Sequence, residues 1–259
     1  MPSFGSGRGG IFDGLAELYD EVRPGYPAAL VDDVLALSRI PAGGAILEVG
    51  CGTGQATRLF APRGYRITCI EPGPGLAARA AANCGAWPDV GVVNARFEDW
   101  PAPEAAFDLV IAAQSFHWVD PAVAYAKAGR CLRETGAIAL FWNRAVGWDP
   151  ELRAALDRVY ERHGVKGAMG VRHPQMPGVQ EAIETTGLFG PVRSERYPWT
   201  DRRSAEEYVK LLSTHSDHAS LPEGVLRSLC GEIRALIEDA GGEIAVEHVA
   251  VLYFALRRR

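Results

Sequence analysis

Several features that mark common protein classes are scarce in this chain of 259 residues. It holds only five cysteines, an odd number, and no two of them form a Cys-x-x-Cys pair. We therefore expect no structural zinc and a reducing compartment. Positive charge is scarce as well, because 27 Lys and Arg face 32 Asp and Glu and leave a formal net charge of -5. Nucleic-acid binders normally carry a basic surface, so this balance weighs against a nucleic-acid partner.

Long apolar runs are also absent. No stretch approaches the roughly twenty apolar residues that cross a bilayer, and the glycine-rich segment 1–10 lacks the apolar core of a signal peptide. We expect residues 1–10 to be a flexible tail, and the protein to be cytoplasmic and without a membrane partner. The composition indicates no preferred oligomeric state. Hydrophobic residues still make up 47% of the chain, enough for a sizeable buried core.

Short apolar runs alternate with segments of helical spacing. Runs that are apolar on both faces are typical of parallel strands covered by helices, and right-handed crossovers between them give a doubly wound sheet. The predicted strands are 45–49, 67–70, 90–93, 108–112 and 137–142. The predicted helices between them are 55–61, 75–84 and 121–136, the last ended by Gly136.

The pattern changes after Asn143. It predicts helices at 150–163, 179–188, 203–214 and 222–239, and strands at 192–199 and 247–257. The expected fold is therefore α/β, with a doubly wound, mostly parallel, seven-stranded Rossmann-like sheet that ends in an antiparallel pair. We divide it into an N-terminal helical lid (11–40), a cofactor-binding core (41–145) and a remainder (146–259). Insertions at about 145–190 and 200–240 should form a helical cap over the carboxyl ends of the strands.

The stretch AILEVGCGTGQATRLF, residues 45–60, predicts a strand, a tight turn with glycines at 50, 52 and 54, and a helix. Glycine lets the backbone approach a ligand closely, and the helix that follows begins with unpaired N–H groups. Glu71 ends the next strand, where a carboxylate can accept hydrogen bonds from both ribose hydroxyls. A nucleotide-like ligand is the natural occupant. The spacing is G-x-G-x-G rather than the G-x-G-x-x-G of dinucleotide sites.

These residues resemble the cofactor loop of class I S-adenosylmethionine-dependent methyltransferases. The likeness covers roughly residues 15–145 and points to the subgroup that includes trans-aconitate methyltransferase and related small-molecule enzymes. It is carried by the motifs YDEVRPGYP, ILEVGCGTGQAT, CIEPGPGL, FEDWPAPEAAFDLVIAAQSFHWVD and GAIALFWN. It implies S-adenosyl-L-methionine as cofactor, methyl transfer by in-line displacement, and a small-molecule acceptor.

The resemblance also implies roles for individual residues. Glu48, Gly50 and Gly52 would hold the methionine part of the cofactor, beside Gly54 and Gln55 in the same loop, and Glu71 would hold the ribose. Gln114 would line the floor beneath the sulfonium, while Tyr19 and Arg23 would close over the cofactor carboxylate. Arg96 departs from the acidic or polar residue usual at the adenine edge, and it cannot accept a hydrogen bond. Adenine is therefore expected on the Phe97 backbone and Glu98.

Acceptor-side residues follow from position and chemistry. A carboxylate acceptor needs no base, whereas an alcohol, amine or carbon acid would use one. The candidate bases are His117 and, from the cap, His215 and His218, of which we favour His117 and His215. Trp142, Asn143 and Arg144 follow the fifth strand, where ligands of such sheets bind, and are the predicted substrate-binding residues. His215 and His218 have metal-ligand spacing, but without a further ligand cluster we predict no metal. Core packing explains His117 equally well, and a role as an anchor for the N-terminal segment explains Arg23 equally well.

Two other functions stay open at this point. A nicotinamide-dependent oxidoreductase would share the fold, although the glycine spacing disfavours it, and calorimetry with both cofactors would separate the two. A binding module that keeps the cofactor fold but catalyses nothing is the third interpretation. The intact loop argues against it, whereas the departure at Arg96 leaves room for it.

Overall fold

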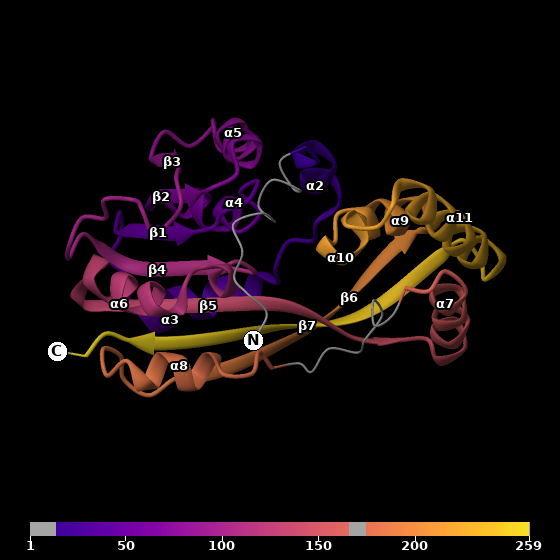
Figure 1. The fold of residues 1–259 in the computed structure, drawn as a ribbon. Coiled ribbons are helices and arrows are strands. Elements are labelled where there is room, and N and C mark those ends of the chain that lie inside the picture. Colours follow the sequence, from indigo (N-terminus) through magenta and orange to yellow (C-terminus); the bar gives the residue numbers. More distant parts are fainter. Residues whose placement is uncertain (1–13, 166–174, 259) are drawn as a thin grey trace.

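The structure is a computed structural model that describes residues 14–165 and 175–258. Within these residues, seven strands form one sheet in the order β3-β2-β1-β4-β5-β7-β6 (Figure 1). The first five are parallel, and β7 runs antiparallel between β5 and β6. The predicted doubly wound, mostly parallel sheet is confirmed. Its strands are β1 (Ala45–Val49), β2 (Arg66–Glu71), β3 (Val90–Asn94), β4 (Phe107–Ala113), β5 (Leu132–Trp148), β6 (Arg193–Ser204) and β7 (Glu243–Leu256).

Helices cover both faces of the sheet because its central strands are apolar on both sides. On one face lie α3 (Ala28–Ser38), α4 (Thr57–Phe60) and α5 (Pro74–Asn83), and Leu30 and Phe60 pack there in one core cluster with Ile46. On the other face lie α6 (Pro121–Cys131) and α8 (Val179–Thr185), whose Ala128 and Ile183 share a cluster with Leu140. Two short 3-10 turns, η1 (Ala61–Arg63) and η2 (Phe116–Trp118), follow α4 and β4.

A second group of helices packs around its own core at the far end of the long strands β5, β6 and β7 (Figure 1). We call it the helical cap. Its members are α7 (Pro150–Arg162), α9 (Ala205–Ser213), α10 (Ser216–Ala219) and α11 (Glu223–Asp239). The cap lies beyond the carboxyl ends of β1 and β4, and α2 (Ala16–Val22) bridges the two parts by contacting α5 and α9. No helix within the described residues is long and apolar enough to cross a membrane.

Two boundary predictions need correction. The helix expected over 121–136 ends at Cys131, because Leu132 already pairs with Phe107 of β4. The pairing then resumes at Ala137 with Leu109, so Gly136 lies in the irregular start of β5 rather than at a helix end. Strand β5 also runs on to Trp148, since its pairing with β7 continues to the Trp148–Val246 pair.

The lid and cap boundaries also differ in detail. Helix α3 falls inside the predicted lid (11–40) but packs on the sheet, where Val31 and Val34 are buried. Helix α8 falls inside the predicted cap insertion (145–190) yet packs beside α6 on the sheet. Of the described helices within the predicted lid and cap segments, α2 and the four cap helices stand at the carboxyl edge. The predicted tail 1–10, residues 11–13 of the lid, and residues 166–174 lie outside the described residues.

Candidate cofactor and acceptor site

The glycine loop closes tightly against its neighbours at the carboxyl end of β1. Gly50, Gly52 and Gly54 all have positive φ, at 68°, 59° and 87°. The Gly50 N–H donates to the carbonyl of Ile70 over 2.7 Å. A Cβ added to Gly50 would lie 2.5 Å from the Cβ of Ser115, so only glycine fits there. The loop thus presents bare backbone at the carboxyl edge of the sheet.

Glu71 ties this loop to the end of β2. Its Oε2 accepts the N–H of Gly52 and its Oε1 accepts the N–H of Gly73, both over 2.9 Å. A carboxylate oxygen has two lone pairs and can accept more than one hydrogen bond. The residue is almost fully buried, which holds its carboxylate in place beside the loop. This arrangement fits two ribose hydroxyls on Glu71.

Glu48 lies in β1, two residues before the first glycine of the loop. The side chain is fully buried, and its Oε2 accepts a hydrogen bond from Thr57 Oγ1 over 2.7 Å. Its Oε1 has no hydrogen-bond partner among the described residues. Burial raises the pKa of Glu48 to about 7, and the negative charge of Glu71 adds to this effect. Glu48 is thus held by Thr57 of α4 in the core, and its predicted contact with the methionine part of the cofactor stays a prediction.

Helix α2 is attached to the loop side of the core. The carboxylate of Asp20 is 8% exposed and pairs with Arg58 and Arg79, each over 3.1 Å. Gln55 Nε2 donates to the backbone carbonyl of Asp20 over 3.1 Å. The side chain of Gln55, a predicted cofactor residue, is therefore hydrogen-bonded to α2 in this conformation. The ring of Tyr19 lies 3.8 Å from the position of a Cβ on Gly52, which places this aromatic residue over the loop.

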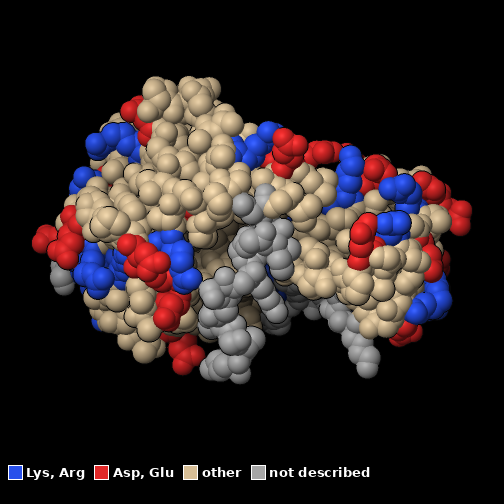
Figure 2. Space-filling view, turned by 45° about the horizontal axis from the view of Figure 1, so that its top comes forward, with Lys and Arg blue, Asp and Glu red and all other residues tan. Residues whose placement is uncertain are grey.

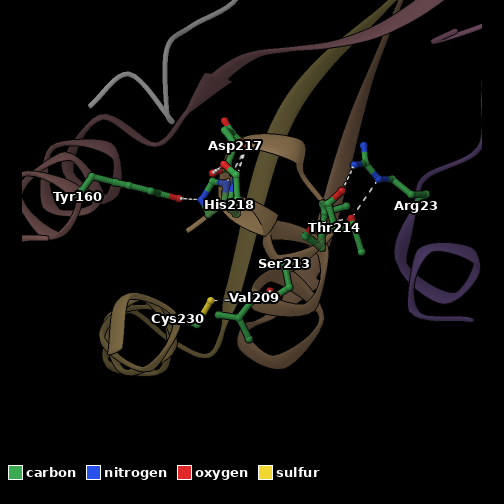
Figure 3. Close-up of polar contacts among 10 residues, drawn as sticks. Arg23, Tyr160, Val209, Ser213, Thr214, Asp217, His218 and Cys230 are labelled. Atoms are coloured by element: carbon green, nitrogen blue, oxygen red, sulfur yellow. Dashed lines mark hydrogen bonds and ion pairs between the residues drawn. The ribbon is translucent and has the colours of Figure 1, made fainter. Parts of the chain in front are cut away.

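Arg23 reaches the cap instead of the loop. Its Nε donates to Thr214 Oγ1 over 3.0 Å and its Nη2 donates to the Thr214 carbonyl over 2.5 Å (Figure 3). Its guanidinium also lies 4.7 Å from the centre of the Tyr19 ring. Lys210 of α9 pairs with Glu21 of α2 over 3.0 Å. The segment therefore joins core and cap, and Arg23 acts as its anchor in this conformation.

The predicted adenine edge follows β3. Arg96 is exposed and bonds Glu98 over 3.1 Å, so it faces solvent and its own loop. Phe97 is buried, and the ammonium of Lys127 lies 5.3 Å from the centre of its ring. Lys127 also donates to the carbonyls of Glu98 and Trp100, over 2.9 and 2.5 Å. Helix α6 thus fixes the shape of this loop through a single buried lysine.

Residues after β4 form the floor between the loop and β5. Gln114 has φ 60° and donates from Nε2 to the Asn143 carbonyl over 3.1 Å. Ser115 Oγ donates to the Val49 carbonyl directly below the glycine loop. Asn143 Nδ2 donates to the Gly25 carbonyl over 2.9 Å, which ties β5 to the segment behind α2. Gln114 and Asn143 therefore meet at the carboxyl edge, as their positions in the sequence predict.

Trp142 does not line the edge itself. Its side chain is 1% exposed, because β5 continues for six residues past it and Tyr253 of β7 packs against its ring. The sequence predicts a substrate contact for Trp142, and that contact stays a prediction for a side chain that is buried in this conformation. Its indole nitrogen donates instead to His117 Nδ1 over 3.2 Å, and His117 is exposed. Arg144, two residues on along β5, is partly exposed on the same side of the sheet.

The cap contributes a hydrogen-bonded chain of three side chains (Figure 3). His218 is fully buried, its Nδ1 bonds Asp217 over 2.9 Å, and its Nε2 bonds the Tyr160 hydroxyl over 2.8 Å. Partial burial alone would raise the pKa of Asp217, but the bond to His218 and the charge of that ring lower it to about 2. Asp217 therefore stays ionised beside the histidine.

His215 lies next to this chain at the start of α10. Its ring centre is 5.9 Å from that of His218. In the described part of the chain, one group of potential metal-ligand side chains comes together, with donor atoms of His215, Asp217 and His218 within 4.8 Å of one another. Both nitrogens of His218 are already bonded to protein groups, so the cluster is a hydrogen-bond network, and we assign no metal to it.

Three contributors were missed by the sequence analysis. Asp20 and Lys127 looked like ordinary surface charges on helices, although each lies one turn from apolar residues of the same helix. Ser115 had a clearer signal, since it directly follows Gln114 within the motif FEDWPAPEAAFDLVIAAQSFHWVD. Their partners come from elements far away in the sequence, which periodicity does not connect.

Comparison with known proteins agrees with this geometry. Residues 47–140 match the family model described as "Methyltransferase domain". An uncharacterized methyltransferase of Mycobacterium tuberculosis is 26% identical over 222 residues, which cover 85% of this chain and 82% of the relative. A malonyl-[acyl-carrier protein] O-methyltransferase of Geobacter sulfurreducens is 36% identical over 115 residues, 42% of each chain. A solved protein of Anaeromyxobacter dehalogenans, described as a type II methyltransferase, aligns with TM-score 0.62 and 26% identity over 91% of this chain and 97% of its own.

Proposed function

We propose that this protein is a class I S-adenosylmethionine-dependent methyltransferase that transfers a methyl group to a small-molecule acceptor. The observation that carries the proposal is the Glu71–Gly52 bond, which holds an acidic residue beside a loop of three positive-φ glycines. The loop and Glu71 both fall inside the region that matches the methyltransferase domain model. A more specific place, in the subgroup that includes trans-aconitate methyltransferase, rests on the sequence motifs alone.

S-adenosylmethionine, when bound, supplies a methyl group that is already activated by the sulfonium. The protein then has to position the acceptor and exclude water. Glu71 would hold the ribose hydroxyls, and the bare backbone at Gly50 and Gly52 would border the amino-acid end. Tyr19 on α2 lies over the loop and would shield it from solvent. The loop after β3, shaped by Lys127, would border the adenine.

A small-molecule acceptor is supported by the cap and by the distribution of charge. The cap stands at the carboxyl ends of β1 and β4, where it would enclose a compact acceptor better than a polymer. On the face shown in Figure 2, acidic and basic side chains are interspersed over both the sheet region and the cap, and neither sign forms a large continuous area. A nucleic-acid substrate would favour a basic surface there.

The acceptor-side residues that we propose are His117, Asn143, Arg144 and, from the cap, His215. His117 follows β4, and Asn143 lies in β5, where its carbonyl accepts a hydrogen bond from Gln114. His215 directly follows Thr214, the cap partner of Arg23. A role for His215 as a base would apply only to an acceptor that loses a proton.

The first experiment is calorimetry with S-adenosylhomocysteine and with the oxidised nicotinamide dinucleotide. Binding of the first and no binding of the second is expected. The reverse would establish the oxidoreductase alternative, which the domain match does not favour.

The second experiment incubates the protein with S-adenosylmethionine carrying an isotope-labelled methyl group and with small-molecule extracts, followed by mass spectrometry. A product heavier by one labelled methyl is expected. Cofactor binding without any such product, in extracts and in nucleic-acid or protein fractions alike, would support a non-catalytic binding module.

A further inference from the structure

The hydrogen bond between Trp142 and His117 determines where His117 carries its proton. An indole nitrogen can only donate, so the imidazole nitrogen that faces it must accept. That nitrogen is Nδ1, 3.2 Å from Trp142 Nε1. A neutral imidazole has one N–H and one lone pair, so the hydrogen of His117 lies on Nε2.

Trp142 is held rigidly in this role. It lies in the middle of β5, paired with Val251 of β7, and is almost completely buried. The ring of Tyr253 packs edge-on against it with 6.0 Å between ring centres. Tyr253 is fixed in turn, because its hydroxyl accepts the backbone N–H of Met176 over 2.8 Å. The indole therefore cannot turn away from His117 without disturbing the core.

His117 stands at the carboxyl edge of the sheet. It belongs to η2, which begins two residues after Gln114, and it is exposed, whereas Phe116 before it is buried. The rings of His117 and Trp118 are 5.0 Å apart, so the exposed imidazole also has a neighbour on one side. Ligands of sheets of this type bind at this edge.

We propose that His117 serves the acceptor molecule as a hydrogen-bond donor through Nε2–H, and that Trp142 is the positioning residue that fixes this tautomer. The proposal rests on the proposed function and replaces the sequence-based hypothesis that His117 is a general base. A base at Nε2 needs its lone pair there, and that tautomer would turn an N–H toward the indole N–H. Two donors facing each other leave both without an acceptor, which is costly near the core.

The proposal restricts the chemistry of the acceptor. The group that contacts His117 must offer a lone pair, such as a carboxylate, carbonyl or ether oxygen. His117 does not remove a proton from the attacking atom. If a proton must be removed, another group does so.

Nuclear magnetic resonance of the full-length protein with 15N-labelled histidine tests the tautomer directly. Long-range proton–nitrogen correlations should show a protonated Nε2 and an unprotonated Nδ1 in His117. The variant W142F removes the indole donor, so the signals should shift toward a mixture of tautomers. A ring protonated on Nδ1 in the wild-type protein would overturn the proposal, whether or not the protein transfers methyl groups.

Substitutions of His117 test the role once a methyl acceptor has been found. H117Q places an amide N–H near the position of Nε2 but cannot act as a base, whereas H117A has neither property. We expect H117Q to stay within about tenfold of the wild-type kcat and H117A to fall well below it. Loss of a base would lower both by about 100-fold or more, and an equal loss in the two variants would overturn the donor role. Affinity for S-adenosylhomocysteine should be unchanged in both.

Discussion

The N–H of Gly52 donates to Oε2 of Glu71 over 2.9 Å, so this carboxylate shapes the glycine loop, and we propose that it also holds the ribose. The substitution E71A removes both contributions. We expect it to weaken binding of S-adenosylhomocysteine by about 1–3 kcal/mol, the usual loss for a hydrogen bond to a charged group. Isothermal calorimetry measures this directly. E71Q keeps one acceptor oxygen and should show a smaller loss, while unchanged affinity in E71A would remove Glu71 from the cofactor site.

Gly50 and Gly64 form a matched pair for testing the loop. Both have positive φ, at 68° and 79°, but a Cβ on Gly50 would meet Ser115 at 2.5 Å whereas one on Gly64 meets nothing within 4 Å. G64A should cost only the backbone strain of about 1–2 kcal/mol and leave cofactor affinity intact. G50A should cost more in urea unfolding and should also weaken S-adenosylhomocysteine binding. Equal losses of stability and of S-adenosylhomocysteine affinity in G50A and G64A would mean that the contact with Ser115 affects neither quantity.

Asp20 should stabilise the attachment of α2, because it is nearly buried between Arg58 and Arg79. Removing one partner of such a network costs more than removing a surface pair. We expect D20N to lower the free energy of unfolding by about 1–3 kcal/mol and to speed hydrogen exchange in α2. D32N is the control, because Asp32 and Arg63 are both well exposed and their pair should contribute less than about 1 kcal/mol. Similar losses in both variants would contradict this account.

Ligand-linked protection of α2 is a separate expectation. A helix this short gains its stability from docking, and closure over the site would exclude water. Hydrogen exchange in Ala16–Val22 should slow when S-adenosylhomocysteine binds. Identical protection with and without the ligand would contradict this expectation. It would make α2 a permanent part of the domain, held by the contacts of Arg23 with Thr214.

The sheet could be predicted from the sequence because the central strands are mostly apolar, although β1 contains Glu48 and β4 contains Asp108. Buried parallel strands have this local signature, and β1 was located to the residue. The end of α6 was missed because the apolar character of Cys131 and Leu132 continues across the boundary between helix and strand. The length of β5 was missed because it depends on pairing with β7, which is distant in the sequence, as in the Trp148–Val246 pair.

The site could be predicted only as far as local motifs reach. The glycine loop and Glu71 follow from residue type and spacing along two neighbouring strands. By contrast, the burial of Trp142 depends on Tyr253, and the engagement of Arg23 depends on Thr214, 191 residues away. Hydrogen-bond partners that are distant in sequence carry no periodic signal, so sequence analysis gave these residues positions but not contacts.

His215 and His218 should differ sharply in what they affect. His218 is fully buried and both its nitrogens are bonded, so H218N should lower the melting temperature. His215 is half-buried at the start of α10, so H215A should leave the melting temperature and cofactor affinity nearly unchanged. If His215 contacts the acceptor, turnover of the acceptor falls in H215A. An equal loss of stability in both variants would place His215 in the fold alone.

Glu48 should make stability depend on pH in a direction opposite to that of most carboxylates. Burial raises its pKa from 4.5 to about 7 in the folded protein, and the unfolded chain keeps an ordinary value. Folding therefore favours the protonated form. This contribution is fully present below about pH 4.5 and is lost as the pH rises through 7. E48Q cannot ionise, and it should match the wild type at pH 4 but be more stable at pH 8, by up to about 3 kcal/mol from the shift in pKa. Urea unfolding of both proteins at the two pH values measures the difference. A wild type that is as stable as E48Q at pH 8, or more stable, would show that Glu48 is charged and satisfied within the core.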